Sequence, residues 1–511
     1  MASIQIGTTN RPWSGQKPFG LTVSDAFQHV WLNGQTGTGK TAALLSMWAQ
    51  VVRKGHGCTL IDLNGDLSLE ALNRIPPNRH HDVVFFDPMD TEHVLPINPF
   101  YNIEPGQRPN VALDFTEALR HIYEDGWGER MDWILRYLNQ AVLDAPAELA
   151  PSILSIPMML QDTRYRRRII KHIKNQRVRD FFEKTFETYS KNRRDDYVTP
   201  IQNKIDKILT NPFITNVLTP YKPTFQFKNA IKDKTILIVR LSTGELGTDP
   251  AGLLGSLTIS TIIKAALAQA ALPNHKRIPH FLFIDEQHNL KANALAKAYS
   301  ETRKYKLAII TSTQYIDQLN GDLIASMFGN IGTTIAFRSS PTDARLLSEQ
   351  FAKFNPDAFT ELGTGEVLVR LLCHGRPTEP FRATTTLDTV PPYNNADTIR
   401  HLVRERYTLP RHQVERDYLH WAKKQTISDE QLRSEREYTA NKRKTHWLKQ
   451  PLPKPLIPEA ERLRAQQSAN QLTAEQVQEK LARMRRALDR HALTRKPTRR
   501  KRRRARRLLD V

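Results

Sequence analysis

The segment 34–41 has the sequence GQTGTGKT, which satisfies the phosphate-loop pattern G-x-x-x-x-G-K-[ST] at every fixed position. Such a loop joins a buried strand to a helix, so that backbone N–H groups and the helix N-terminus face bound phosphate. The flanks fit, because 29–33 has the pattern of a short buried strand and 42–53 has apolar residues at helical spacing. The pattern and its flanks together predict a nucleoside triphosphate site formed by Gly34, Gln35, Thr36, Gly37, Thr38, Gly39, Lys40 and Thr41. The competing interpretation is a glycine-rich turn before a helix.

Strand patterns alternate with helical patterns before residue 90 and again from about residue 235. Apolar runs predict strands at 58–62, 83–86, 235–239, 281–284, 307–311, 333–337 and 366–371, and a long helix begins near residue 250. This alternation predicts an α/β fold, a mostly parallel sheet with helices on both faces. Ligands of such sheets bind at the carboxyl ends of the strands, where Asp62 and Asp87 fall.

Polar residues at the ends of three strands are candidates for the chemistry of the site. Asp285 and Glu286 follow the strand 281–284, and we expect Asp285, with Thr41, to hold Mg²⁺ while Glu286 orients and polarises the attacking water. Gln314 follows the strand 307–311 and is the candidate sensor of the γ-phosphate. Arg303 lies near a helix end, where a cation is also favourable for purely structural reasons. Arg338 closes the strand 333–337.

The pattern between the two groups of strands is helical. We predict a motor domain from 1–104 and 225–397, an all-helical insertion at 105–224, a helical segment at 398–448, and a proline-rich linker, amphipathic helix and basic tail at 449–511. The insertion carries basic clusters at 164–168 and 191–194, which fit either a solvated helix face or a grip on nucleic-acid backbone. The predicted helix from Thr473 has a capping box with Gln476.

The charge of the chain points to polyanionic partners. The 511 residues carry a formal net charge of +22, and 483–511 alone contain 14 Lys and Arg against 2 Asp. This favours nucleic acid first and an anionic membrane surface second. Two cysteines without a pairing pattern indicate a reducing cytosol. The longest apolar stretch, 251–272, is interrupted by Ser, Thr, Lys and Gln, so we expect a buried helix and no transmembrane segment. His80 and His81 fit a loop pair better than a metal site.

The joint order of the motifs over residues 25–425 resembles one family closely. The motifs are the phosphate loop, Asp-x-x-Gly-Asp at 62–66, Phe-Asp-Pro at 86–88, the helical insertion, Ile-Asp-Glu at 284–286, Arg-Lys-Tyr at 303–305, Ser-Thr-Gln at 312–314 and GNIGTTIAFR at 329–338. The order is similar to that of the TraG/TraD-type coupling ATPases of conjugative type IV secretion, within the HerA/FtsK class of ring-shaped DNA motors. Two features depart from the family: Leu63 and Asn64 replace a common Pro-His, and only some thirty residues precede the loop, so we expect no membrane anchor of the usual kind.

The resemblance implies a RecA-like P-loop NTPase fold, ATP and Mg²⁺ as cofactors, and a homo-hexamer that hydrolyses ATP at subunit interfaces while drawing DNA through a central channel. Lys40, Glu286, Gln314 and Arg303 would be its catalytic residues, with Arg303 inserted into the neighbouring site and Arg338 as the alternative. It further implies relaxase and type IV secretion components as partners, and a cytoplasmic location, with attachment to the inner face of the membrane left open.

Two other functions are compatible with these motifs. The first is a HerA-like translocase that works with a nuclease in repair or defence, and the second is a nucleotide-gated adaptor that recruits protein cargo. The sequence leaves the strandedness of the DNA and the direction of movement open.

Overall fold

The computed structural model describes residues 3–10, 16–123, 126–290 and 293–425, together with Gln476, Gln478, Glu479, Ala482 and Arg483. Residues 1–425 form one compact unit, and 426–511 are a separate unit. The predicted proline-rich linker, most of the predicted amphipathic helix and the basic tail lie outside the described residues. The domain boundaries assigned above stay a prediction.

An eleven-stranded sheet forms the centre of the first unit, in the order β2-β1-β14-β11-β10-β3-β9-β8-β4-β7-β5. The strands from β10 to β5 in this order are parallel, and β2, β1, β14 and β11 add an antiparallel extension at one side. The strands are β1 (Ser3–Thr9), β2 (Pro18–Thr22), β3 (Val30–Asn33), β4 (Gly57–Asp62), β5 (Val83–Phe86), β7 (Ile236–Arg240), β8 (His280–Ile284), β9 (Leu307–Thr313), β10 (Thr333–Ala336), β11 (Glu366–Arg370) and β14 (Phe381–Thr385).

The parallel strands match the predicted ones to within two residues at each end, and the predicted mostly parallel sheet is confirmed. The antiparallel extension was not predicted in full, because β1, β2 and β14 contain no long apolar run. β9 continues to Thr313, so Ser312 and Thr313 belong to the strand and not to the loop after it.

Alternate residues of the parallel strands point to opposite faces of the sheet, which creates two apolar cores. One core combines Leu32, Ile238 and Phe283 with α2 (Lys40–Arg53) and α3 (Asp66–Leu72). The other combines Ile61, Leu282 and the other strand residues of that face with α12 (Thr248–Ala268), α13 (Asn293–Glu301) and α14 (Gly321–Asn330). The sheet is therefore covered on both faces, as a parallel sheet requires.

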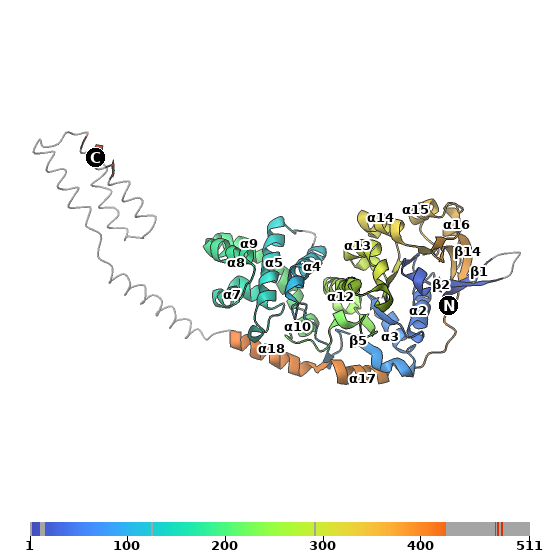
Figure 1. Cartoon of the computed structure of the whole chain (residues 1–511), viewed down its shortest axis with the longest axis horizontal. Coiled ribbons are helices and arrows are strands. Elements are labelled where there is room, and N and C mark those ends of the chain that lie inside the picture. The colour runs from blue at the N-terminus through green and yellow to red at the C-terminus, as the bar shows by residue number, and fades with distance from the viewer. Residues whose placement is uncertain are drawn as a thin grey trace, which may run out of the picture. The chain divides into compact units, whose positions relative to one another are not determined.

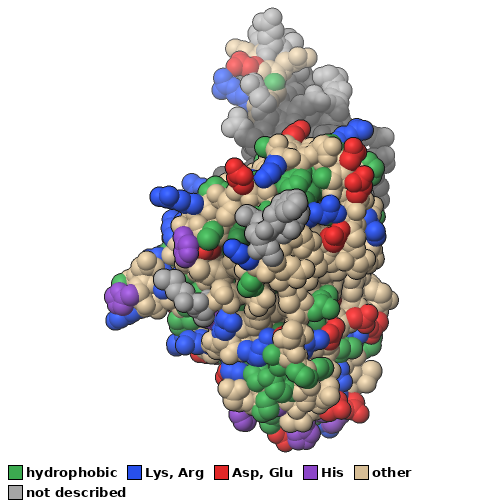
Figure 2. Space-filling model, turned by 90° about the vertical axis from the view of Figure 1, so that its right-hand side faces the viewer, with side chains coloured by type: hydrophobic (Ala, Val, Ile, Leu, Met, Phe, Trp, Pro, Cys, Tyr) green, Lys and Arg blue, Asp and Glu red, His purple; other side chains and the backbone are tan. Residues whose placement is uncertain are grey.

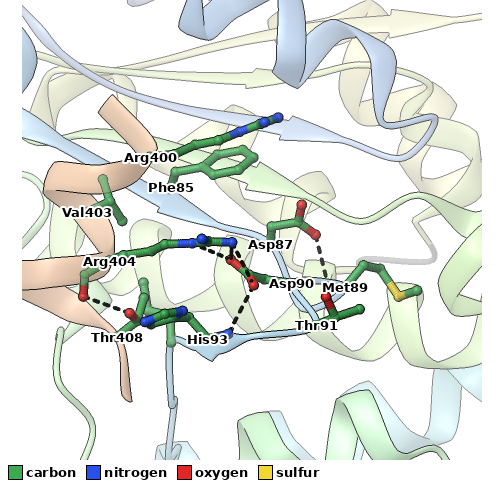
Figure 3. Close-up of a pocket in the computed structure, with 11 residues that line it drawn as sticks. Phe85, Asp87, Met89, Asp90, Thr91, His93, Arg400, Val403, Arg404 and Thr408 are labelled. Carbon is green, nitrogen blue, oxygen red and sulfur yellow. Dashed lines mark hydrogen bonds and ion pairs between the residues drawn. The ribbon is translucent and has the colours of Figure 1, made fainter. Parts of the chain in front are cut away.

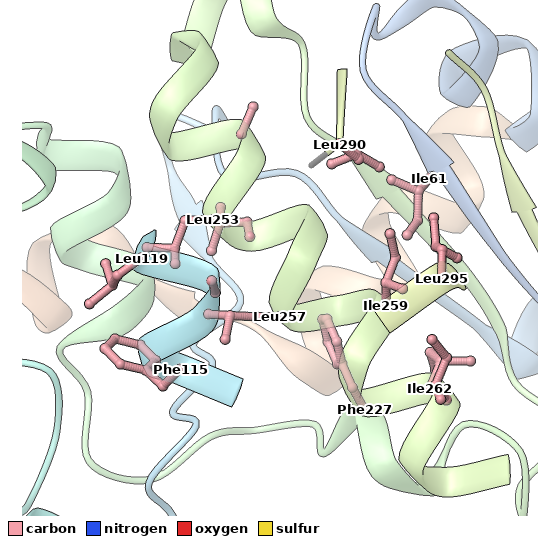
Figure 4. Packing of buried hydrophobic residues seen from close by; sticks show 14 of the residues in the cluster. Ile61, Phe115, Leu119, Phe227, Leu253, Leu257, Ile259, Ile262, Leu290 and Leu295 are labelled. Atoms are coloured by element: carbon pink, nitrogen blue, oxygen red, sulfur yellow. The ribbon is translucent and has the colours of Figure 1, made fainter. Parts of the chain in front are cut away.

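The chain between β5 and β7 forms the helical insertion, which lies beside the sheet region in Figure 1. Its α-helices are α4 (Arg108–Ile122), α5 (Glu129–Asp144), α6 (Ser155–Gln161), α7 (Thr163–Ile170), α8 (Gln176–Asp180), α9 (Lys191–Leu209) and α10 (Pro212–Leu218). Leu253 and Leu257 of α12 pack near Phe115 and Leu119 of α4 (Figure 4), so the insertion and the sheet share one continuous core.

The helix α12 is the long apolar segment of the sequence. Within the described residues, the helical segment Thr248–Ala271 alone is long and apolar enough to cross a membrane by length and composition. Half of its most apolar window is buried inside the fold, where Ile259 and Ile262 belong to the core. Its residues are therefore accounted for as a core helix between the sheet and α4.

The last segment of the first unit connects the sheet region to the insertion. It contains α17 (Ala396–Tyr407), the short strand β15 (Leu409–Pro410) and α18 (Arg411–Gln425), and we call residues 396–425 the strap. β15 pairs with β6 (His93–Val94), α17 packs on β5, and α18 contacts α10 (Figure 1). The strap is therefore attached both to the edge of the sheet and to the insertion.

Candidate functional site

The phosphate loop joins β3 to α2, as the sequence predicts. Gly39 precedes α2 with φ 107°, and Gly37 has φ 74°, values that favour glycine. At Gly34, an added Cβ would lie 2.6 Å from Cβ of Phe337, so the close approach of the chain after β10 excludes a side chain. Among the described residues, the backbone N–H groups of Thr36, Gly37, Thr38 and Gly39 have no hydrogen-bond acceptor. The loop therefore offers a row of unpaired donors.

Lys40 is buried at the end of this loop, with 8% of its surface exposed. Its Nζ donates a hydrogen bond to the carbonyl oxygen of Gln35 at 2.8 Å. Burial lowers the pKa of Lys40, an effect that the nearby charges of Asp285 and Glu286 oppose. The ammonium is therefore a buried charge whose nearest compensation comes from two carboxylates of another strand end.

Those carboxylates follow β8. Asp285 is 2% exposed; its Oδ2 accepts a hydrogen bond from Thr41 Oγ1 at 3.2 Å, and its Oδ1 accepts one from Ser312 Oγ. Burial raises the pKa of Asp285, and the charges of Asp62 and Glu286 act in the same direction. The predicted metal ligands Thr41 and Asp285 are thus in direct hydrogen-bond contact.

Glu286 has a left-handed backbone conformation, with φ 54° and ψ 53°. A residue with a Cβ adopts this region only when its surroundings hold it there, and such strain is common at functional sites. The holding contact is a hydrogen bond from the N–H of Glu286 to Ser312 Oγ at 2.9 Å. Ser312 thereby fixes both acids of the pair, one through its carboxylate and one through its backbone.

Gln314 follows β9. In the sheet, β9 lies between β3, which leads to the phosphate loop, and β8, which leads to the two acids. Its Nε2 donates a hydrogen bond to Thr36 Oγ1 of the phosphate loop. The order β3-β9-β8 therefore brings together all the predicted site residues except the two arginines. Thr313 Oγ1 also accepts hydrogen bonds from Trp31 and Asn33, which ties β9 to the strand before the loop.

The two arginines lie at different places. The carbonyl oxygen of Arg338 accepts the N–H of Gln35 at 2.8 Å, so Arg338 adjoins the phosphate loop of its own chain. Arg303 is exposed and precedes β9, near His29 at the amino end of β3. Because β9 has seven residues, the strand places Arg303 about 20 Å from Gln314. The chain does not bring Arg303 to its own site.

Sequence reasoning did not single out Ser312 as a functional residue, nor His288. Ser312 directly follows the predicted strand 307–311, and its role depends on a contact with the neighbouring strand end that the sequence does not reveal. His288 lies close enough to Glu286 and Lys40 to feel their charges, and burial lowers its pKa. The signal for His288 was its position three residues after Asp285, which a short turn brings back toward the acids.

Asp62 and Asp87 have structural partners. Both carboxylate oxygens of Asp62 accept backbone N–H groups, from Asn64 and Gly65 on one and from Ser68 on the other, so this buried side chain shapes the turn into α3. Asp87 pairs with Arg240 at 3.3 Å, far along the sheet from β8. Neither residue contacts Lys40 or Asp285, although the charge of Asp62 raises the pKa of Asp285.

A cleft of about 240 Å³ lies next to Asp87, between the end of β5 and α17 (Figure 3). Its polar walls are largely paired: Arg404 of the strap donates to both carboxylate oxygens of Asp90 at 3.0 Å, and the N–H of His93 donates to Asp90 as well. This cleft is a seam between the strap and the sheet, and the phosphate loop has no part in it.

One family model matches the chain over residues 19–353, the model of the type IV secretion-system coupling protein DNA-binding domain. The chain belongs to this family. The predicted resemblance is thereby confirmed at the level of the family. The match begins before β3 and ends after α15 (Pro341–Gln350), so it includes the phosphate loop, the insertion, both acids and both arginines of this family member.

Solved structures show the same fold at low sequence identity. The unbound conjugative coupling protein TrwBdeltaN70 has a TM-score of 0.54 and 16% identity, covering 74% of this chain and 88% of that chain. TrwB with the ATP analogue ADPNP has a TM-score of 0.54 and 16% identity, covering 76% and 95%. TrwB with ADP and Mg²⁺ has a TM-score of 0.54 and 17% identity, covering 77% and 97%. A search of curated proteins found no match.

Proposed function

We propose that this family member is an ATP-dependent DNA motor of conjugative transfer, which hydrolyses ATP with Mg²⁺ where two subunits of a hexameric ring meet. The observation that carries the proposal is the convergence of Lys40, Thr41, Asp285, Glu286 and Gln314 at the carboxyl edge of three adjacent strands. TrwB, which shares the fold, has been solved with ADPNP and with ADP and Mg²⁺.

The residues present fit a triphosphate with its metal ion. The unpaired amides of 36–39 are donors for phosphate oxygens, and an added Cβ at Gly37 would meet nothing within 4 Å, so the cradle is open on that side. Lys40 supplies a cation for the phosphates, while Thr41 and Asp285 supply the hard oxygen ligands that Mg²⁺ prefers. Burial shifts the pKa values of Lys40 and Asp285 against their charged forms. Each would gain an oppositely charged partner on binding, Lys40 from the phosphates and Asp285 from Mg²⁺.

Bound ATP and Mg²⁺ would supply the phosphoryl group that is transferred to water, giving ADP and phosphate, and the positive charge that assists the transfer. Glu286 would orient the water and accept its proton, since the Ser312 hydrogen bond holds the backbone of Glu286 beside Asp285. Gln314, through its contact with Thr36, would link the phosphate loop to β9. Lys40 would hold the phosphates in line for attack.

The position of Arg303 supports catalysis between subunits. An arginine that stabilises the transition state in trans must lie away from the site of its own chain and be exposed to a neighbour, and Arg303 meets both conditions. Arg338 meets neither, because it adjoins the phosphate loop of its own subunit and is half-buried. We therefore assign the trans role to Arg303.

The partner would be DNA. On the face seen in Figure 2, Lys and Arg side chains are scattered among Asp and Glu and do not gather in one patch. The largest concentration of positive charge in the sequence is the tail 483–511, which would bind DNA without reading its sequence and with an affinity that falls as salt rises. Relaxase, secretion components and the inner face of the membrane remain proposed partners of the same machine.

An ATPase assay with single-stranded, double-stranded and no DNA across a salt series tests this function. Hydrolysis should be stimulated by DNA, and Lys40→Ala and Glu286→Gln should each reduce kcat by on the order of 10³-fold. Lys54→Ala, which removes an exposed lysine after the same helix α2, is the control and should leave kcat unchanged. Nucleotide-dependent DNA binding without directed movement in single-molecule tracking would instead indicate an adaptor.

A further inference from the structure

A buried polar contact connects the loop after the acid pair with the helix that precedes Arg303. Gln287 follows Glu286 directly and has no exposed surface. Its Oε1 accepts a hydrogen bond from the hydroxyl of Tyr299 at 2.7 Å, and Tyr299 is 2% exposed. The same hydroxyl lies 3.1 Å from Thr311 Oγ1 of β9. One side chain of α13 therefore contacts both the acid loop and β9, the strand that precedes Gln314.

The other contacts of Tyr299 lie toward the amino edge of the sheet. Its carbonyl oxygen is 3.1 Å from Nε2 of His29, and the two rings meet edge to face with centroids 5.3 Å apart. His29 Nδ1 accepts the N–H of Ile309, so Nε2 carries the proton and donates it to Tyr299. Burial lowers the pKa of His29 to about 4, so this ring is neutral at pH 7. Arg303 is four residues after Tyr299 and close enough to His29 to affect that pKa.

The contact is shielded from water, because Gln287 and Tyr299 are buried and Tyr299 belongs to an apolar core. Leu295, Ala298, Ile309, Ile316 and Met327 belong to the same apolar core. The free-energy cost of leaving a buried amide without its hydrogen-bond partner is larger than the net contribution of the bond. Separating the acid loop from α13 is therefore unfavourable, and the two segments are expected to move together. The amide nitrogen of Gln287 has only a weak acceptor, Met327 Sδ at 3.6 Å, which leaves the Tyr299 hydroxyl as its main polar anchor among the described residues.

We propose that Tyr299 is a positioning residue, which couples the acid loop of one nucleotide site to the end of α13 that presents Arg303 to the next subunit. The inference rests on the proposed function, because Arg303 must act in trans for the coupling to matter. Nucleotide that shifts Glu286 and Gln287 in one subunit would thereby move or fix Arg303 for the neighbouring site.

Hydrogen exchange of the full chain with and without ADPNP and Mg²⁺ tests the coupling without requiring hydrolysis. In the wild type, bound nucleotide should slow exchange at 36–42, at 284–290 and at 299–307. In Tyr299→Phe, which keeps the ring and removes the hydroxyl, the first two responses should remain and the third should fall by about tenfold, a typical size for coupling between sites. An equal response at 299–307 in the variant overturns the inference. If 36–42 of the wild type shows no response, the proposed function fails, and the inference fails with it.

A second variant separates coupling from stability. Tyr299→Phe leaves the Gln287 oxygen without a donor, whereas Tyr299→Phe with Gln287→Leu removes both partners, which restores most of the lost stability. The double variant should still lack the response at 299–307. Tyr165→Phe is the matched control, because it removes a buried tyrosine hydroxyl from Ser155 at 2.7 Å inside the insertion. It should leave the response intact. Recovery of the response in the double variant would reduce Tyr299 to a structural role.

Discussion

Lys40 in the motor and Arg166 in the insertion are both buried cations, and they are satisfied to very different degrees. The guanidinium of Arg166 donates to Glu187 Oε1 at 2.8 Å, to the Met159 carbonyl at 2.7 Å and to Thr163 Oγ1 at 3.0 Å, and it lies over the Phe186 ring. The ammonium of Lys40 donates one hydrogen bond, to the Gln35 carbonyl, and has no other hydrogen-bond acceptor among the described residues.

The difference is the one expected between a structural charge and the binding charge that we propose for Lys40. A buried cation is tolerated when hydrogen bonds and an opposite charge replace water, as around Arg166. Two of the three N–H donors of Lys40 have no acceptor among the described residues, so hydrogen bonds do not fully compensate its burial in the folded chain, and phosphate bound as proposed would do so. The basic cluster 164–168 was a candidate DNA grip, yet its central Arg166 and Tyr165 are buried, and only the flanking Arg167 and Arg168 are exposed.

Arg303 provides a third kind of cation, exposed and remote from the site of its own chain, and its removal should have the largest effect. In a homogeneous ring, Arg303→Ala should lower kcat by about 10³-fold or more, as loss of a trans-acting arginine does elsewhere. In rings mixed from wild-type and variant subunits, activity should fall more steeply than the fraction of variant. A loss proportional to that fraction would assign Arg303 a structural role, and Lys304→Ala is the exposed neighbouring control.

For Arg166 the comparison predicts loss of stability and not of chemistry. Arg166→Leu leaves the Glu187 carboxylate without its partner in a partly buried place, so the free energy of unfolding should fall by about 3 kcal/mol. Arg167→Leu, on the exposed side of the same helix, should change it by less than about 0.5 kcal/mol. Denaturant unfolding measures both. ATPase activity per folded molecule should be unchanged in either variant. A loss of this activity in Arg166→Leu alone would indicate that the cluster 164–168 has a functional role.

The sequence was sufficient to predict the parts of the fold that depend on local pattern. The phosphate loop, the parallel strands and their helices could be located because each is a continuous run of residues with its own periodicity. The position of Asp285 beside Thr41 also followed, since carboxyl ends of neighbouring parallel strands meet at one edge.

Features that depend on contacts between distant segments could not be predicted. The pairing of β1 with β14, the seat of the strap and the role of Ser312 each join residues more than twenty positions apart. The Tyr299–Gln287 contact joins residues only twelve positions apart, but it could not be predicted either, because a tyrosine at an apolar position of a helix gives no sign of the acceptor that its hydroxyl will meet. The roles of the individual site residues stay predictions that the variants above test.

The free-energy cost of burying Asp285 at the nucleotide site should be measurable as a pH dependence of stability. The pKa of Asp285 is raised in the folded chain, so its contribution to stability is fully present below the ordinary pKa of a carboxyl and is lost as pH rises through the folded value. Asp285→Asn removes this titration. Without nucleotide the variant should be more stable than the wild type at pH 8, by about 1 kcal/mol, and the difference should vanish near pH 3.

A carboxyl group whose pKa is lowered in the folded chain is the control for that measurement. Asp180 lies on the surface of the insertion, and hydrogen bonds from Lys184 and Gln176 lower its pKa. Its contribution is present above the ordinary carboxyl pKa and is lost as pH falls through the folded value, so Asp180→Asn should give a pH trend of opposite sign. Equal trends for the two variants would mean that burial of Asp285 is not the cause.

The smallest effect on stability is expected at the strap, where the ion pairs of Arg404 are partly exposed to water. Arg404 donates to both oxygens of Asp90 and to Glu92, but about a third of its side chain is exposed, so Arg404→Ala should lower the free energy of unfolding by about 1 kcal/mol or less. Because Asp90 and Glu92 lie on the segment that leads from β5 to the insertion, loss of the pair should loosen α17 locally before it affects the sheet. Limited proteolysis within 396–410 should therefore accelerate while nucleotide affinity is unchanged. Arg400→Ala, whose ion pair with Asp397 is 3.8 Å long and solvent-exposed, should alter neither.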